Sequence, residues 1–283
     1  MRPFNLLGIT SLCLLFVFSQ SSLVGHAKDI EWQSLEKGLK LTQLSKNEGQ
    51  NSPLKSVELG IYILKIDPDF FNFRLLSASE YDSQRKSLKD WIKEFDLVAG
   101  INASMFWQDF ETSTGYMRNF DHINNDLIHP DYNAFLCFNP HNPDISKIQI
   151  IDRKNDPEWK NKIDNYHTVI QNYRMISSNQ NNVWEDNDRS YSVAAIGMEK
   201  KSNHVLFILS RKPRTIHELN SILLSSRVSI SVCMFVEGGP TAGLYIKSQS
   251  IEQGCYGLST KALWSSKPES LNKIPNVIGI ERK

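Results

Sequence analysis

The chain has 283 residues, and its 32 lysine and arginine residues almost balance 31 aspartate and glutamate residues, for a formal net charge of +1. This balance excludes the broad basic field that draws a protein to nucleic acid or anionic lipid, so we expect no nucleic-acid partner and only local recognition of anions. The length exceeds that of an average domain but is ordinary for one mixed α and β domain.

The first 27 residues have the features of a secretory signal. Arg2 provides a positive start, residues 6–24 are mostly apolar, and Gly25-His26-Ala27 has the small-x-small pattern that signal peptidase prefers. The polar residues 19–22 interrupt the apolar run and leave it short for a membrane span, although an uncleaved anchor is the alternative. We therefore expect cleavage after residue 27, no membrane association afterwards, and a secreted or periplasmic location.

The rest of the chain begins with strand patterns. We expect residues 28–54 to form an N-terminal extension or an edge strand, and residues 55–283 to form the functional domain. Apolar and β-branched runs at 57–67 and 71–79 flank Pro68-Asp69, which predicts an antiparallel pair joined by a tight turn. Runs of the same kind predict strands at 97–106, 134–138, 147–152, 192–198, 204–210, 229–236, 242–247 and 276–281.

Two segments have helical spacing instead. In residues 87–95, Ser87 is a candidate N-cap with Asp90 three residues later, and in residues 215–226 Thr215 and Glu218 form a capping box. Strands outnumber helices severalfold. The sequence therefore predicts an α+β fold, with a large, mainly antiparallel or mixed sheet and a few packed helices.

The least regular stretch is residues 108–132, which is polar but rich in aromatic residues. Long polar loops within compact domains are usually functional or disordered, and the aromatic residues argue against disorder. Residues 179–189 form the other conspicuously polar run, which we interpret as a surface excursion. The candidate binding residues in and beside the first stretch are Trp107, Asp109, Glu111, Tyr116 and Arg118.

The cysteines do not suggest a disulfide framework. Cys137 and Cys233 lie in apolar runs where small buried thiols are common, and three cysteines remain beyond the predicted signal. One bridge between Cys233 and Cys255 is compatible with an oxidising compartment.

Several common catalytic and metal-binding motifs are absent from the sequence. It contains no G-x-S-x-G elbow, no H-E-x-x-H and no Walker loop. The run from Asp186 begins like a calcium loop but has Tyr191 and Gly197 where glycine and glutamate are needed. The histidines lack metal-ligand spacing. We therefore expect no cofactor and no defined metal site, with a calcium ion in the acidic loop as an alternative whose ligands the spacing does not specify.

The stretch "FVEGGPTAGLYI" (235–246) combines an acid with two glycines between apolar runs. Glu237 ends a predicted strand, and Gly238-Gly239 allows a sharp turn and a close approach of the backbone to a ligand. The simpler interpretation is a hairpin turn with an incidental acid. Asn102 also follows an apolar strand, while Arg174 and Arg189 lie at the borders of apolar segments, as either surface groups or anion ligands.

Five segments in this order resemble the phosphodiester glycosidase family, which includes an enzyme that removes N-acetylglucosamine from a phosphate diester. The resemblance covers roughly residues 55–281 and is closer to a bacterial exported branch. Two departures are the Glu237 position, where many members have aspartate, and "GCYGLST" (254–260), which lacks an acid beside Tyr256. The segments are "AGINASMFWQDFETSTGYMRNF", "RSYSVAAIGMEKKSNHVLFIL", "TIHELNSILL", "MFVEGGPTAGLYI" and "IPNVIGI".

The resemblance implies an exported hydrolase that cleaves a sugar-1-phosphodiester at the glycosidic bond, with a carbohydrate phosphodiester as its substrate partner and no cofactor. The alternative is a non-catalytic carbohydrate-binding or glycopolymer-binding envelope protein on the same scaffold. The oligomeric state is left open. The catalytic candidates are Glu237, Asn102 and Asp109; the substrate-binding candidates are Arg118, Arg174, Arg189, Gly238, Gly239, Tyr116 and Glu111, with Trp107 as a further stacking candidate.

Overall fold

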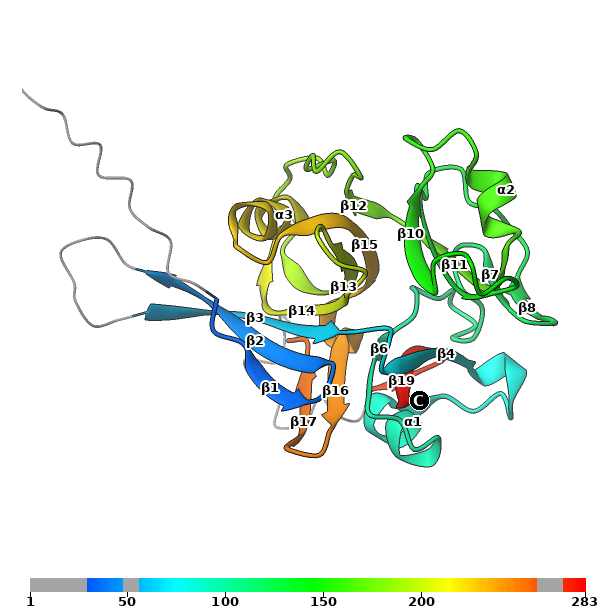
Figure 1. The fold of residues 1–283 in the computed structure, drawn as a ribbon, viewed down its shortest axis with the longest axis horizontal. Coiled ribbons are helices and arrows are strands. Elements are labelled where there is room, and N and C mark those ends of the chain that lie inside the picture. Colours follow the sequence, from blue (N-terminus) through cyan, green and yellow to red (C-terminus); the bar gives the residue numbers. More distant parts are fainter. Residues whose placement is uncertain (1–29, 48–55, 259–271) are drawn as a thin grey trace, which may run out of the picture.

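The computed structural model describes residues 30–47, 56–258 and 272–283, so the predicted signal, residues 1–27, lies outside the described residues. Within these ranges the chain forms a seven-stranded sheet, two five-stranded sheets and a two-stranded ladder, with three α-helices packed against them (Figure 1). The strand pairs are antiparallel, which confirms the predicted α+β class. No helix in the described ranges is long and apolar enough to cross a membrane.

The seven-stranded sheet carries the strand that ends at Glu237. Helix α3 (Ile216–Ser225) covers one of its faces, and the Thr215 hydroxyl accepts a hydrogen bond from Glu218 N at 3.0 Å, which confirms the predicted cap. In spatial order the strands are β1 (Gln33–Glu36), β2 (Leu39–Asn47), β3 (Ser56–Ile66), β14 (Val205–Arg214), β13 (Tyr191–Glu199), β15 (Ile230–Gly238) and β12 (Arg174–Ile176).

The two five-stranded sheets lie on the other side of the molecule (Figure 1). The second sheet carries helix α2 (Trp159–Ile163) and has the order β10 (Ile148–Asp152), β9 (Ala134–Pro140), β11 (Tyr166–Asn172), β7 (Met117–Asn119) and β8 (His122–Asn125). The third sheet packs against helix α1 (Leu88–Glu94), whose Ser87 cap is also confirmed. Its order is β17 (Glu252–Tyr256), β16 (Gly243–Lys247), β6 (Ala99–Asn102), β19 (Asn276–Arg282) and β4 (Phe71–Ser77). The short elements are β5 (Lys86–Ser87), which pairs with β18 (Lys273–Ile274), and the 3₁₀ turns η1 (Ala78–Glu80) and η2 (Gly239–Thr241).

The predicted hairpin of 57–67 and 71–79 is wrong. Strand β3 is paired on both sides, by β2 and β14, whereas β4 pairs with β19 in the third sheet. Pro68-Asp69 is therefore a corner between two sheets rather than the turn of a hairpin. The stretch 108–132 is also more regular than predicted, because it contains β7 and β8.

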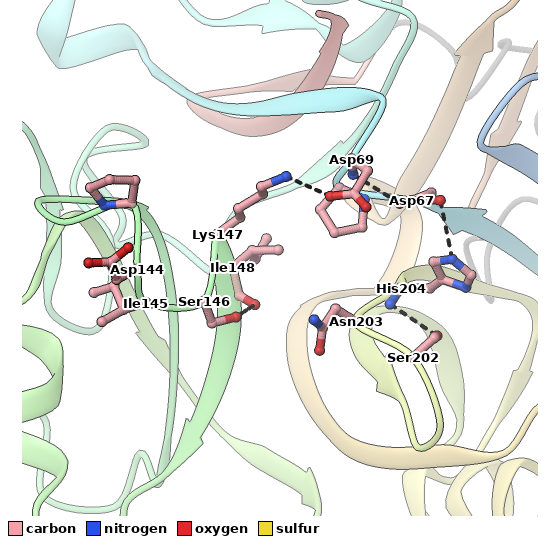
Figure 2. Close-up of a pocket in the computed structure, with 12 residues that line it drawn as sticks. Asp67, Asp69, Asp144, Ile145, Ser146, Lys147, Ile148, Ser202, Asn203 and His204 are labelled. Atoms are coloured by element: carbon pink, nitrogen blue, oxygen red, sulfur yellow. Dashed lines mark hydrogen bonds and ion pairs between the residues drawn. The ribbon is translucent and has the colours of Figure 1, made fainter.

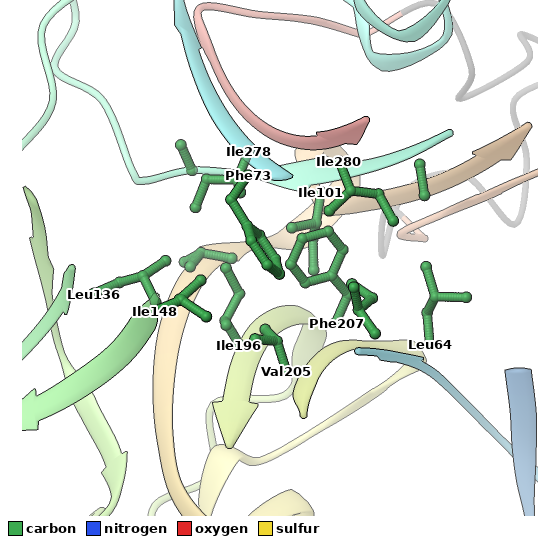
Figure 3. Close-up of a cluster of buried hydrophobic side chains, with 14 of the residues drawn as sticks. Leu64, Phe73, Ile101, Leu136, Ile148, Ile196, Val205, Phe207, Ile278 and Ile280 are labelled. Carbon is green, nitrogen blue, oxygen red and sulfur yellow. The ribbon is translucent and has the colours of Figure 1, made fainter. Parts of the chain in front are cut away.

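The three sheets share one hydrophobic core, which fixes their relative positions. Phe73 of β4 packs edge-on against Phe207 of β14, with ring centroids 6.3 Å apart, and also against Phe138 of β9 (Figure 3). Cys137 and Cys233 are buried as predicted, and both are free thiols, as is Cys255. The suggested Cys233–Cys255 bridge is thus not formed.

Candidate active site at a crossover between two sheets

The acid-Gly-Gly stretch forms the crossover between two sheets. Strand β15 ends in the seven-stranded sheet at Gly238, and after the η2 turn the chain enters β16 of the third sheet. Gly239 has φ +74°, a left-handed conformation that favours glycine, and a Cβ at this position would meet no atom of the described residues within 4 Å. Among the described residues, no side chain or backbone therefore covers Gly239 in this crossover turn (residues 237–243).

Glu237 is buried beside this open turn, with a residue exposure of 8%. Burial raises the pKa of its carboxyl to about 8, and the hydrogen bond from Gly238 N together with the nearby Thr241 side chain offsets only part of that rise. Gly238 N donates to Glu237 Oε1 at 2.9 Å. At neutral pH the folded protein therefore carries Glu237 mainly as a neutral carboxylic acid that can donate a proton.

Asn102 fixes the far end of the crossover turn. Its buried side chain donates from Nδ2 to Thr241 O at 3.0 Å and accepts from Gly243 N at Oδ1 at 2.8 Å. The Thr241 hydroxyl in turn donates to Gly238 O at 3.1 Å. The structure thus brings Asn102 and Glu237 to the same turn, and the Asn102 amide is engaged by the backbone on both of its polar atoms.

The altered "GCYGLST" segment packs directly on the crossover turn. Gly257 N donates to Ala242 O at 2.7 Å, and Leu258 N donates to Ser192 Oγ at 2.8 Å. A Cβ at Gly257 would lie 2.1 Å from Gly239 O, which is closer than any non-bonded contact allows. There is thus no room for a side chain at Gly257, the position beside Tyr256 where the resemblance suggests an acid.

Of the predicted arginines, Arg189 is the one that is close in sequence to a residue that touches the turn, because it precedes Tyr191 by two residues. The Tyr191 ring touches the turn, since a Cβ on Gly238 would lie 2.9 Å from two of its atoms. Burial raises the pKa of the Tyr191 hydroxyl, and the charge of Arg189, two residues earlier in the chain, counteracts part of this rise. Arg189 is exposed and forms no ion pair within the described part of the chain. Its charge is available for an anion.

The other two predicted arginines are engaged elsewhere in the fold, Arg118 within the second sheet and Arg174 between the seven-stranded sheet and the second sheet. Arg174 Nη1 forms a buried ion pair with Asp152 Oδ1 at 2.5 Å. Arg118 Nη2 donates to Tyr166 O at 2.7 Å and to Ile163 O at 3.4 Å. These contacts stabilise β7, β10 and β12, and they leave neither guanidinium at the crossover turn.

The remaining predicted residues lie in the 107–116 segment. Asp109 Oδ1 accepts hydrogen bonds from Glu111 N and Thr112 N. The pKa of the Asp109 carboxyl is lowered from its ordinary value, mainly by a hydrogen bond with the Thr112 side chain. Glu111 is held through its backbone oxygen by Asn124 Nδ2. Tyr116 packs in the small apolar cluster beside α2, and Trp107 is 49% exposed. Glu111 O also accepts a hydrogen bond from Asn276 Nδ2 of β19 at 3.5 Å, so these residues contact the third sheet as well as this loop and the second sheet.

Three polar residues at the crossover were not predicted: Tyr191, Ser192 and Thr241. Thr241 follows Glu237 closely in "EGGPT", so its position in the motif was an available signal. Tyr191 and Ser192 begin β13, whose Val193 pairs with Gly238, and only this strand pairing shows that they lie beside the turn.

A polar hollow of about 600 Å³ lies far from this turn, between the β3–β4 corner, the β9–β10 loop and the β13–β14 turn (Figure 2). His204 lies there between two acids, with Nδ1 2.9 Å from Glu199 Oε2 and Nε2 3.5 Å from Asp67 Oδ2. Because β13 starts at the crossover turn and ends at Glu199, the two places are separated by roughly 20 Å of strand. The hollow contains none of the predicted site residues.

No metal centre accompanies the site in the residues described, since no group of three or more histidine, cysteine, aspartate or glutamate side chains there could hold an ion. In particular, Asp109 and Glu111 do not converge with further acids to form the calcium site considered above.

Comparisons with known proteins agree with this architecture. Over 90% of this chain and 87% of the other, the fold matches the catalytic domain of zebrafish N-acetylglucosamine-1-phosphodiester alpha-N-acetylglucosaminidase, with a TM-score of 0.58 and 11% identity. A hypothetical protein from Synechocystis matches over 91% of this chain with a TM-score of 0.59 and 11% identity, and this chain spans 64% of its length. At such identities the likeness concerns the fold alone, and no curated protein matches the chain. The phosphodiester glycosidase family model, however, matches residues 95–281, well over half of the sequence, and the chain therefore belongs to the phosphodiester glycosidase family.

Proposed function

We propose that this protein is an exported hydrolase that cleaves a sugar-1-phosphodiester between the anomeric carbon and the phosphate oxygen, with Glu237 as the catalytic acid. The observation that carries the proposal is a buried acid with a raised pKa, about 8, at an open turn of the backbone. Family membership supports the reaction class. The apolar stretch with a small-x-small end at residues 25–27 supports export.

A neutral acid suits this substrate better than a carboxylate would. The phosphodiester carries a negative charge, so an ionised Glu237 would repel it, whereas a protonated Glu237 can donate a hydrogen bond to it. As the bond between the sugar and the oxygen breaks, the Glu237 proton passes to that oxygen and the phosphate monoester leaves. Water adds to the anomeric carbon, and its proton restores Glu237, so that the products are a free sugar and a phosphate monoester.

The phosphate charge requires its own partners. Arg189 is the predicted arginine with no partner of its own, and a guanidinium presents a planar set of donors to phosphate oxygens. The backbone at Gly238-Gly239 can approach the same group because no side chain covers it. Asn102 has a positioning role in this scheme, since both of its polar atoms hold the turn. Arg118, Arg174, Tyr116, Asp109 and Glu111 take no part in the proposed step.

A second candidate function is carbohydrate or glycopolymer binding without turnover. The observation that favours it is Gly257, where the segment packs so tightly on Gly239 that an additional acid could not be accommodated. A protein of this kind would bind a sugar phosphodiester and leave it intact.

The test uses a panel of 4-nitrophenyl sugar-1-phosphodiesters, with a phosphatase coupled to release the dye, beside the matching 4-nitrophenyl glycosides. We expect cleavage of at least one diester and not of its glycoside, and a loss of about a thousandfold in kcat for Glu237→Gln. Glu185→Gln, which changes an exposed acid on the 179–189 segment, serves as the matched control. If Glu237→Gln cleaves as fast as the control, the catalytic assignment is wrong, and tight binding without cleavage supports the second candidate.

Export has a separate test. The chain would be expressed with a C-terminal tag in a bacterial host, and the mass of the recovered protein would be measured. We expect a mature N-terminus at Lys28 outside the cytoplasm. Recovery of the uncleaved chain from the cytoplasm would refute this part of the proposal.

A further inference from the structure

A second hollow, of about 530 Å³, lies between the N-terminal strands and β17. Strands β1, β2 and β3 border it on one side and β17 on the other, and Figure 1 shows these two groups of strands beside each other. The hydroxyl of Ser250, in the turn between β16 and β17, donates a hydrogen bond to Leu35 O of β1 and so joins the two sides. We call this the N-terminal hollow, and its polar lining includes Glu31, Gln33, Thr42, Gln43, Tyr62 and Gln253.

Strand pairing places one side of the lining on a single face of the seven-stranded sheet. Gln33 of β1 pairs with Leu41 of β2. Two residues further along β2, Gln43 pairs with Tyr62 of β3. Paired residues and alternate residues share a face, so these four side chains lie on the same side of the sheet. It is the side toward the third sheet, because Leu41 and Tyr62 pack against the core that the three sheets share.

Gln253 reaches the hollow from the third sheet. It shares a face of β17 with Cys255, which packs against the same core, and Gln253 Nε2 donates to Cys255 Sγ at 3.5 Å. Gln253 pairs with Ile246 of β16, three residues beyond Gly243 at the end of the crossover turn. Three residues of strand span roughly 10 Å, so the N-terminal hollow and the crossover turn are separate places.

The lining of the N-terminal hollow is polar but almost uncharged. Glu31 is its one acid or base of the aspartate, glutamate, lysine or arginine type among the described residues, whereas the hollow at His204 is lined by three aspartates and a lysine. Each of the three glutamine side chains offers two N–H donors and a carbonyl acceptor, which match hydroxyl groups that both donate and accept. The flat ring of Tyr62 offers an apolar face to a sugar ring. This chemistry suits a neutral ligand with many hydroxyl groups.

We propose that the N-terminal hollow binds a neutral saccharide, at a site separate from the crossover turn. Apart from Gln253, its lining comes from residues 31–62, which precede the segment 95–281 that matches the family model. Gln43 and Tyr62 also take part in other interactions, but an amide and a phenol can each form several hydrogen bonds at once. The site does not depend on the proposed reaction, because none of its residues contributes to the step at Glu237.

The test is calorimetric titration of the purified chain with neutral tetrasaccharides of α-linked glucose, β-linked glucose, mannose and N-acetylglucosamine. We expect at least one to bind, and Gln33→Ala/Gln253→Ala to weaken its binding about tenfold, because the variant removes hydrogen bonds to hydroxyl groups. Both glutamines are exposed, so the melting temperature should not change. The matched control is Gln84→Ala/Gln249→Ala, which removes two exposed glutamines that do not line the hollow and should bind like the wild type.

Two further arms test the ring and the charge. Tyr62→Phe keeps the flat ring and should bind at least ten times more tightly than Tyr62→Leu, which keeps only apolar packing. Tetragalacturonate, whose rings each carry a carboxylate, should bind about tenfold more weakly than the best neutral tetrasaccharide, because the lining offers it no counter-charge. Tighter binding of tetragalacturonate, or no binding of any neutral tetrasaccharide, would overturn the proposal.

Cleavage assays separate this site from the proposed reaction. The Gln33→Ala/Gln253→Ala variant should cleave the 4-nitrophenyl diesters at the wild-type rate, and Glu237→Gln should bind the tetrasaccharide as the wild type does. If no diester is cleaved but the tetrasaccharide binds and Gln33→Ala/Gln253→Ala weakens it, the saccharide site stands without the reaction. If binding is lost in Glu237→Gln and kept in Gln33→Ala/Gln253→Ala, the saccharide binds at the crossover turn and the N-terminal hollow is not its site.

Discussion

Two regions of this protein bury acids in opposite ways. At the edge of the second sheet, Asp152 is paired with Arg174 at 2.5 Å and accepts further hydrogen bonds from Ser178 N at 2.9 Å and Asn155 Nδ2 at 2.8 Å. At the crossover turn, Glu237 has one backbone donor and the Thr241 side chain, and burial raises its pKa to about 8. The first acid is paired with a positive charge within the fold. The second is buried without a counter-charge, which favours its protonated form.

The difference separates an acid that stabilises the fold from an acid that can take part in a reaction. Pairing a buried acid with a guanidinium and backbone donors satisfies it and leaves nothing for a ligand. An acid that is buried without a counter-charge retains a proton that it can transfer, and such groups concentrate at functional sites. Two of the three arginines predicted to bind phosphate, Arg118 and Arg174, belong to the first of these regions. Arg189, which precedes Tyr191 by two residues, does not belong to it.

The largest effect on stability should come from breaking the ion pair between Asp152 and Arg174. Replacing Asp152 by asparagine leaves the buried Arg174 without a counter-charge, and the loss of one partner of a buried pair typically costs about 3–5 kcal/mol. We expect Asp152→Asn to lower the free energy of unfolding in urea by that amount. Activity per folded molecule should stay close to that of the wild type, because in the described residues neither side chain of this pair forms a hydrogen bond with Glu237 or with the crossover turn. A stable but inactive Asp152→Asn protein would show that the two regions are not separate.

The opposite result is expected at the crossover turn, where removing the charge should stabilise the protein. In the unfolded chain Glu237 has its ordinary pKa of 4.5, and in the folded protein the pKa is about 8. Between these values only the folded state keeps the proton, so stability falls as the pH rises from about 5 to 8, by roughly 4 kcal/mol in all.

Glu237→Gln cannot ionise and should escape this loss. We expect its unfolding free energy to match that of the wild type near pH 4.5 and to exceed it by a few kcal/mol at pH 8, as measured by urea titration across that range. Asp152→Asn should show no comparable gain. Parallel pH profiles for the wild type and Glu237→Gln would contradict the raised pKa and, with it, the assignment of Glu237 as an acid.

These two regions also show what the sequence could and could not predict. Both capped helices and most strands of the core follow from local pattern and were predicted correctly, and Glu237 was chosen as a candidate because an acid and two glycines end an apolar run. The phosphate role of Arg118 rested on its place in the polar stretch 108–132, and that of Arg174 on its position at the border of an apolar segment. That position is the same for a surface group, a buried ion pair and a ligand, and only the tertiary contact with Asp152 or Tyr166 O distinguishes them.

The remaining misses have the same origin. The pairing of β3 with β2 and β14, instead of with β4, is decided between segments far apart in the chain. Strand β11 was missed because its buried Gln171 and Asn172 break the apolar pattern, although each is satisfied by hydrogen bonds to the backbone.

A smaller effect should come from the packing that holds the crossover turn. In Gly257→Ala the new methyl would meet Gly239 O at 2.1 Å, and because a backbone carbonyl cannot move away as a side chain can, the turn must shift. We expect a loss of about 1–3 kcal/mol in stability together with a loss of activity. Gly239→Ala is the matched comparison: its methyl meets no atom, so only the left-handed φ is strained, at about 1 kcal/mol. Equal effects in the two variants would mean that the Tyr256–Leu258 segment does not position the turn.

The smallest effect on stability, but a clear one on substrate binding, is expected for Arg189→Ala. Since this guanidinium is exposed and has no partner in the residues described, its removal should change the unfolding free energy by less than about 0.5 kcal/mol. If it binds the phosphate, KM for the diester should rise about tenfold, and the difference from the wild type should shrink at high salt because exposed charges are screened. Lys201→Ala, at the far end of β13, removes an equally exposed charge and should leave KM unchanged. A KM that rises in both variants would indicate that exposed positive charge attracts the anionic substrate in general. A KM that rises in neither would mean that the phosphate is bound by the backbone of the crossover turn. This pair of variants therefore decides whether a cation belongs to the site around Glu237.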